Sequence, residues 1–130
     1  MQMFADHMSL WVVDVQLAVN FFKSLGWEIA DNRNPVWDTG QAQFMVRRDN
    51  AVALQLTEER DQLAGASGSA LHLGFKCDVV EALETMKDFC RGNNQAIDVE
   101  DVGGGKMMVQ VPSIFRCCAL ELVPIRQQQQ

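Results

Sequence analysis

The chain has 130 residues, of which 48% are hydrophobic and 22% are charged. This length suits one globular domain and is too short for two of ordinary size. Acidic residues outnumber basic ones by 17 to 11, giving a net charge of −6, so the clustered positive charge that binds nucleic acid is not expected. No apolar stretch approaches the roughly 18 residues that span a bilayer, so we expect no membrane partner.

The cysteines and the first residues of the chain indicate the cellular compartment in which the protein is expected. None of the four cysteines has the spacing of a zinc knuckle or a disulfide framework, and two are adjacent: Cys77, Cys90, Cys117 and Cys118. We expect them to be buried small hydrophobic residues in a reducing environment. The first residues also lack the basic segment of a signal peptide. The sequence therefore predicts a cytoplasmic protein.

The first half of the chain predicts the element order βαβββ. An apolar strand over residues 7–13 is followed by Asp14, a helix N-cap, and by a helix over residues 15–25 that ends at Gly26. Strand-forming segments then alternate with turns, and we expect three further strands, at residues 27–30, 42–47 and 51–57. A long loop over residues 31–40 separates the first two of these.

The second half predicts the same order after a polar, glycine-rich connection. A strand over residues 70–77 leads to Asp78, which with Glu81 forms a capping box, and then to a helix over residues 79–91 that stops at Gly92. Glycines 103 to 105, followed by Lys106, predict a hairpin turn rather than a phosphate-binding loop, since no helix follows. The three remaining strands are expected at residues 97–100, 106–111 and 116–123.

The spacing of these signals reveals a repeat. His7 and His72, the only histidines, open the first strand of each half and lie 65 positions apart, while the two capping aspartates lie 64 apart. We therefore predict an α+β fold of two tandem βαβββ modules, over about residues 5–60 and 70–125, within a single domain spanning residues 1–130. Residues 126–130 are expected to be a disordered tail.

Strand alternation divides each strand into two faces. On the first strand, Met8, Leu10 and Val12 should face the helix, which leaves His7 on the other face together with Ser9 and Trp11. The second face of the last strand in each half carries one polar residue suited to metal binding, and these two residues lie 66 positions apart: Gln55 and Glu121.

If the modules pack about a pseudo-twofold axis, two imidazoles, an amide and a carboxylate converge: His7, His72, Gln55 and Glu121. Such a donor set suits a divalent Zn, Ni, Mn, Fe or Co ion with positions open for substrate. Gln55 is either the fourth ligand or part of the polar lining of the cavity.

At these residues the chain resembles the vicinal oxygen chelate superfamily, the glyoxalase/bleomycin resistance protein/extradiol dioxygenase group. The resemblance lies in HMSLWVVDVQLAVNFFKSLGWEIAD in the first half, and in ALHLGFKCDVVEALETM and ALELV in the second. It covers nearly all of residues 5–125 and implies curled mixed sheets around a ligand cavity and a divalent metal on the four residues named above. It also implies a homodimer, with the cavity either within one chain or built from one module of each chain.

Two departures from the family pattern narrow the expected chemistry. The usual acidic-glycine turn before the last strand is replaced by residues 112–116, and Gln55 stands where glyoxalase I proteins have Glu. Because an amide cannot abstract a proton, Glu121 would be the catalytic base. The chain contains no tyrosine, the second-sphere acid associated with many extradiol enzymes, which makes dioxygenase activity less expected.

We therefore expect a metal-dependent small-molecule enzyme of the glyoxalase/lyase type that chelates vicinal oxygens of its substrate. The alternative is a non-catalytic, bleomycin-resistance-type protein that sequesters a drug or metabolite. Trp11 and Trp37 are candidates for ligand stacking, or else for core or dimer packing. Arg47 and Arg48 could steer an anionic substrate, but a solvated strand end is the stronger expectation.

Overall fold

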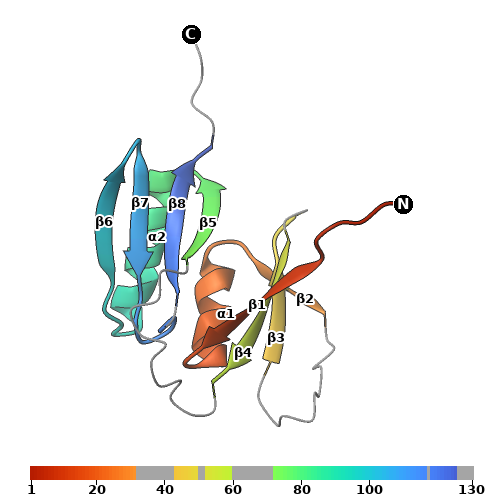
Figure 1. The fold of residues 1–130 in the computed structure, drawn as a ribbon. Coiled ribbons are helices and arrows are strands. Elements are labelled where there is room, and N and C mark those ends of the chain that lie inside the picture. The colour runs from red at the N-terminus through yellow and green to blue at the C-terminus, as the bar shows by residue number, and fades with distance from the viewer. Residues whose placement is uncertain (32–42, 50–51, 60–71, 117, 126–130) are drawn as a thin grey trace. The chain divides into compact units, whose positions relative to one another are not determined.

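The computed structural model describes residues 1–31, 43–49, 52–59, 72–116 and 118–125. The chain divides into two compact units, residues 1–64 and 65–130, which are described separately below. Both have the order βαβββ, so the α+β fold of two tandem modules is confirmed (Figure 1). The expected tail, residues 126–130, lies outside the described residues, as do residues 60–71, which join the modules.

Unit 1 is a four-stranded mixed sheet with one helix. Its elements are β1 (His7–Val12), α1 (Val15–Ser24), β2 (Glu28–Asp31), β3 (Gln43–Arg47) and β4 (Ala53–Glu58). The strand order is β1-β4-β3-β2, with β1 and β4 parallel and the other pairs antiparallel. The helix packs mainly on β3 and β4 and buries an apolar stripe that includes Ala18, Phe21 and Phe22.

Unit 2 repeats this arrangement. Its elements are β5 (His72–Cys77), α2 (Val79–Gly92), β6 (Asp98–Gly103), β7 (Lys106–Gln110) and β8 (Ala119–Pro124). The strand order is β5-β8-β7-β6, again with the first and last strands parallel. Met86 and Cys90 of α2 are buried, as are Leu120 and Leu122 of β8. Neither helix is long and apolar enough to cross a bilayer.

Both helices begin at the predicted aspartates. The Asp14 side chain accepts a hydrogen bond from the Leu17 N–H at 3.0 Å, and Asp78 accepts one from the Glu81 N–H at 3.1 Å. Each carboxylate thus satisfies a backbone donor that the first helical turn leaves unpaired.

The end of α1 is also as predicted. Gly26 adopts φ +92°, and the Trp27 N–H donates to the Phe22 carbonyl at 3.0 Å, which is a Schellman motif. The rings of Phe22 and Trp27 pack with centroids 5.3 Å apart, supplying the apolar contact typical of this motif.

Helix α2 ends at Gly92, as predicted. Gly92 is the last helical residue, and Asn94 takes the left-handed conformation instead, with φ +56°. The Gln95 N–H donates to the Cys90 carbonyl at 2.8 Å, so the same motif forms two residues later. Asparagine tolerates this conformation better than most residues, which is why the glycine is not needed there.

The exposed fractions of Met8 and of the cysteines test two other expectations about the fold. Met8 is 49% exposed rather than packed against the helix, because β1 is an edge strand and α1 packs mainly on β3 and β4. Cys90 and Cys118 are buried, as expected, and burial raises the pKa of the Cys90 thiol, which makes it unreactive. Cys117 lies outside the described residues.

The glycines at the two helix ends should respond oppositely to alanine. In Gly26→Ala, a Cβ would sit at positive φ and 3.3 Å from the Arg48 Cζ atom, so we expect a loss of about 1 to 2 kcal/mol in the free energy of unfolding. In Gly92→Ala, the Cβ meets nothing within 4 Å, and we expect a gain of about 0.5 to 1 kcal/mol. Urea unfolding of both variants measures this, and equal effects would contradict the assignment of the two helix ends.

Candidate functional site

The candidate residues of unit 2, His72 and Glu121, lie on adjacent parallel strands. The register pairs His72 with Ala119 and Gly74 with Glu121, so the two side chains lie on the same face of the sheet, opposite the buried Leu120 and Leu122. The His72 Nε2 atom is 3.2 Å from the Glu121 Oε1 atom, and the side chains are 45% and 20% exposed. The structure thus brings these two predicted residues into contact.

Gly74 leaves space beside this pair. A Cβ built on Gly74 would meet the Glu121 Oε1 atom at 3.8 Å, with no other described atom outside the neighbouring residues within 4 Å. Because glycine has no side chain, Gly74 itself does not cover the Glu121 carboxylate.

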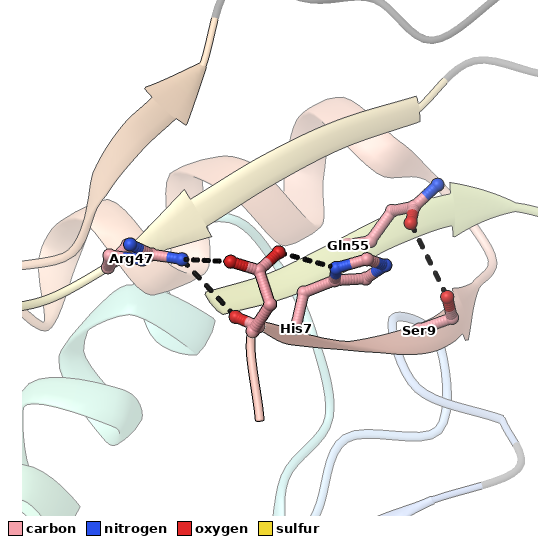
Figure 2. Close-up of polar contacts among 5 residues, drawn as sticks. His7, Ser9, Arg47 and Gln55 are labelled. Carbon is pink, nitrogen blue, oxygen red and sulfur yellow. Dashed lines mark hydrogen bonds and ion pairs between the residues drawn. The ribbon is translucent and has the colours of Figure 1, made fainter. Parts of the chain in front are cut away.

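Unit 1 repeats the arrangement with an amide in place of the carboxylate. The register pairs His7 with Ala53 and Ser9 with Gln55, which is the same offset as in unit 2. Gln55 is only 7% exposed, and the Ser9 hydroxyl donates to its Oε1 atom at 3.5 Å. Figure 2 shows the His7 ring and the Gln55 side chain on one side of these strands.

Asp6, which the sequence analysis did not single out, contacts His7. Its Oδ2 atom is 2.9 Å from the His7 Nδ1 atom, and the Arg47 Nη2 atom lies 3.7 Å from Oδ1 (Figure 2). The hydrogen bond to His7 and the nearby charges of His7 and Arg47 lower the pKa of the Asp6 carboxyl below its usual value. The only sequence signal for this contact is an acidic residue directly before the strand histidine.

The donor atoms of unit 2 are compatible with a shared metal ion. Two neighbouring ligands that each lie about 2.0 to 2.2 Å from a tetrahedral or octahedral ion are about 2.8 to 3.6 Å apart, and the His72–Glu121 distance of 3.2 Å falls in this interval. Among the described residues, no three His, Cys, Asp or Glu side chains form a metal-binding group. Each unit by itself therefore supplies two of the four candidate ligands.

The remaining candidates have separate positions. Trp11 lies on the His7 face of β1 and is 41% exposed, whereas Trp37 lies outside the described residues. Arg47 contacts Asp6, and the Arg48 Nη1 atom donates to the Leu25 carbonyl at 2.7 Å, so both arginines make structural contacts. Glycines 103 to 105 form the β6–β7 hairpin turn, as predicted.

No protein-family model and no curated protein sequence matches this chain. Solved structures do match it. Glyoxalase I from Leishmania major, described as trypanothione-dependent, has a TM-score of 0.65 at 18% identity, over 95% of this chain and 88% of that one. An antibiotic binding protein from Streptomyces sp. CB03234, TnmS3, has a TM-score of 0.59 at 16% identity, over 95% and 96%.

A third match carries the name of the family itself. The glyoxylase/bleomycin resistance protein/dioxygenase domain from Frankia sp. EAN1pec has a TM-score of 0.61 at 15% identity, over 97% of this chain and all of that one. These matches extend over nearly the whole chain and share its fold of two βαβββ modules. The chain therefore has the fold of the vicinal oxygen chelate superfamily, the glyoxalase/bleomycin resistance protein/dioxygenase group.

Proposed function

We propose that this protein is a metal-dependent small-molecule enzyme of the glyoxalase/lyase type, in which His7, His72 and Glu121 bind a divalent ion and Gln55 is the fourth ligand. The observation that carries this proposal is the repeated register. In each unit a histidine opens the first strand, and a Gln or Glu lies two residues past the histidine's partner on the neighbouring strand. The convergence of the two pairs on one ion is part of the proposal.

The chemistry of the donors supports a divalent ion of the Zn, Ni, Mn, Fe or Co group. Imidazole and carboxylate are ligands for these ions, and an amide oxygen adds no charge. A bound ion that keeps positions open for two vicinal oxygens of a substrate would act as a Lewis acid and polarise them. The net charge of −6 is compatible with binding a cation.

Glu121 is the catalytic base in this proposal. It is the only one of the four residues whose side chain is a carboxylate, and it is 20% exposed beside the space at Gly74. A proton on a carbon next to a carbonyl is acidified when that carbonyl is polarised, and a carboxylate within reach can accept it. Gln55 cannot do so because an amide oxygen is not basic.

Loss of either unit 2 ligand should reduce metal binding. We expect the wild-type chain to retain about one divalent ion per pair of units. His72→Ala and Glu121→Gln should each weaken ion binding at least about tenfold, since each removes a direct ligand. Isothermal titration with Ni, Zn and Mn, together with elemental analysis of the dialysed protein, measures both effects.

The matched control for the glutamate is Glu84→Gln, which makes the same change at an exposed position of α2 and should bind metal like the wild type. If Glu121→Gln and Glu84→Gln bind an ion equally well, the assignment of Glu121 as a ligand is wrong. If the wild type takes up no ion, the enzyme proposal fails.

Gln55→Glu separates a metal ligand from a polar lining residue. Gln55 is 7% exposed, so a carboxylate there should lower the free energy of unfolding by about 1 to 3 kcal/mol without metal. If residue 55 is a ligand, an added ion should stabilise this variant more than the wild type, by about 1.4 kcal/mol for each tenfold gain in affinity.

Thermal unfolding with and without the ion measures this difference. Gln16→Glu, an exposed substitution on α1, is the control and should show the wild-type response to metal. An equal response of all three proteins would make Gln55 a lining residue.

A non-catalytic binding protein is the second candidate. Trp11 supports it, because this large aromatic side chain is 41% exposed on the same strand face as His7 and offers a stacking surface. TnmS3, with the same fold, is described as an antibiotic binding protein. If the wild type retains a metal ion and His72→Ala loses it, the enzyme is favoured. If the protein binds a small molecule without any metal, the binding protein is favoured.

We also propose that the chain forms a homodimer, as the family resemblance implies. Sedimentation velocity at micromolar concentration should give the mass of two chains. A monomer across that range would contradict a cavity built from two copies.

A further inference from the structure

We infer that Asp6, held by Arg47, is a positioning residue that keeps the His7 ring in the tautomer with its proton on Nδ1 and its lone pair on Nε2. This inference rests on the proposed function only in the use it gives to His7, since a histidine binds a metal through a nitrogen that carries no proton.

The contact between Asp6 and His7 determines the tautomer. A neutral imidazole has one donor nitrogen and one acceptor nitrogen, whereas an ionised carboxylate can only accept. The Asp6 Oδ2 atom lies 2.9 Å from the His7 Nδ1 atom, so Nδ1 must donate to it. The Nε2 atom is then left as the acceptor, ready to bind an ion.

Arg47 and β4 hold Asp6 in place from two sides. The Asp6 backbone carbonyl accepts hydrogen bonds from the Ala53 N–H and from the Arg47 Nη2 atom, both at 3.2 Å. The same Nη2 atom lies 3.7 Å from the Asp6 carboxylate. The backbone contacts fix the position of the Asp6 main chain. The Asp6 side chain is 75% exposed, so its rotamer is restricted by the carboxylate contacts with Arg47 and His7 rather than by burial.

The two histidines differ in whether a carboxylate directly precedes them in the chain. In the sequence, an aspartate precedes His7, whereas the residue before His72 is Leu71, whose side chain cannot accept a hydrogen bond. His72 instead contacts Glu121 through its Nε2 atom. A carboxylate that orients a metal-binding imidazole through its other nitrogen is a recurrent arrangement in metal sites, and in this chain only His7 has one among the described residues.

The tautomer can be measured without any metal. Long-range ¹⁵N–¹H correlation spectra of the metal-free protein at about pH 8, where an unperturbed imidazole is neutral, distinguish the two tautomers. Only two histidines occur, so His7→Gln assigns both sets of signals. We expect the Nδ1–H form for His7 in the wild type, a shift toward the Nε2–H form in Asp6→Ala, and an intermediate result in Asp6→Asn, which keeps an oxygen acceptor without charge.

The His72 signals are the internal control and should not change in either Asp6 variant. Asp88→Ala, which removes an exposed carboxylate paired with Arg91 on α2, is the matched control for the lost charge. An unchanged His7 tautomer in Asp6→Ala overturns the inference.

Metal titration of the same proteins tests the consequence. Asp6→Ala should bind a divalent ion about 10- to 100-fold more weakly than Asp88→Ala. Equal affinities in the two variants would overturn the positioning role even if the tautomer shifts. If the wild type binds no ion while the tautomer responds to Asp6, the proposed function fails and the control of the His7 tautomer by Asp6 stands.

Discussion

The parallel pairing of the first and last strand of each unit is the constraint on which the candidate site depends. Side chains alternate along a strand, so a slip of one residue between β1 and β4 would move Gln55 to the face opposite His7. Hydrogen bonds hold this register at both ends, from the Ala53 N–H to the Asp6 carbonyl and from the Glu59 N–H to the Val12 carbonyl. In unit 2 the Ile125 N–H donates to the Cys77 carbonyl at the corresponding end.

The helix that follows each first strand fixes which face stays available for chemistry. Asp14 and Asp78 cap helices that begin within three residues of the strand end, so the helix must fold back over the apolar face of its own sheet. In unit 1 the link is reinforced, because the Glu58 side chain of β4 accepts a hydrogen bond from the Val15 N–H at 2.9 Å. The histidine face is therefore the one without the helix.

Much of this could be predicted from sequence because it depends on local patterns. Strand alternation, the two capping aspartates and Gly26 define the elements and their faces, and the repeat spacing pairs His7 with His72. Other features depend on contacts between distant residues. The Arg47 contact with Asp6 joins positions 41 residues apart, and the exposure of Met8 depends on which strands the helix covers, neither of which a sequence pattern specifies.

The same distinction applies to the end of α2. Glycine is the residue most often found in the left-handed position after a helix, but Gly92 is the last helical residue of α2. Asn94 can also adopt that conformation, and the helix extends to the point where the Gln95 N–H reaches the Cys90 carbonyl. Propensity ranks the candidates for a helix end, but the hydrogen bonds that form in the folded chain select among them.

We propose that His7 and His72 are ligands of the same ion. X-ray absorption at the metal edge of the Ni- or Zn-loaded protein tests this most directly, because imidazole rings give a characteristic outer-shell scattering that counts them. We expect two imidazoles per ion, with nitrogen and oxygen ligands at about 2.0 to 2.2 Å, and one imidazole in His7→Gln. A spectrum of the wild type with one imidazole or none would contradict it.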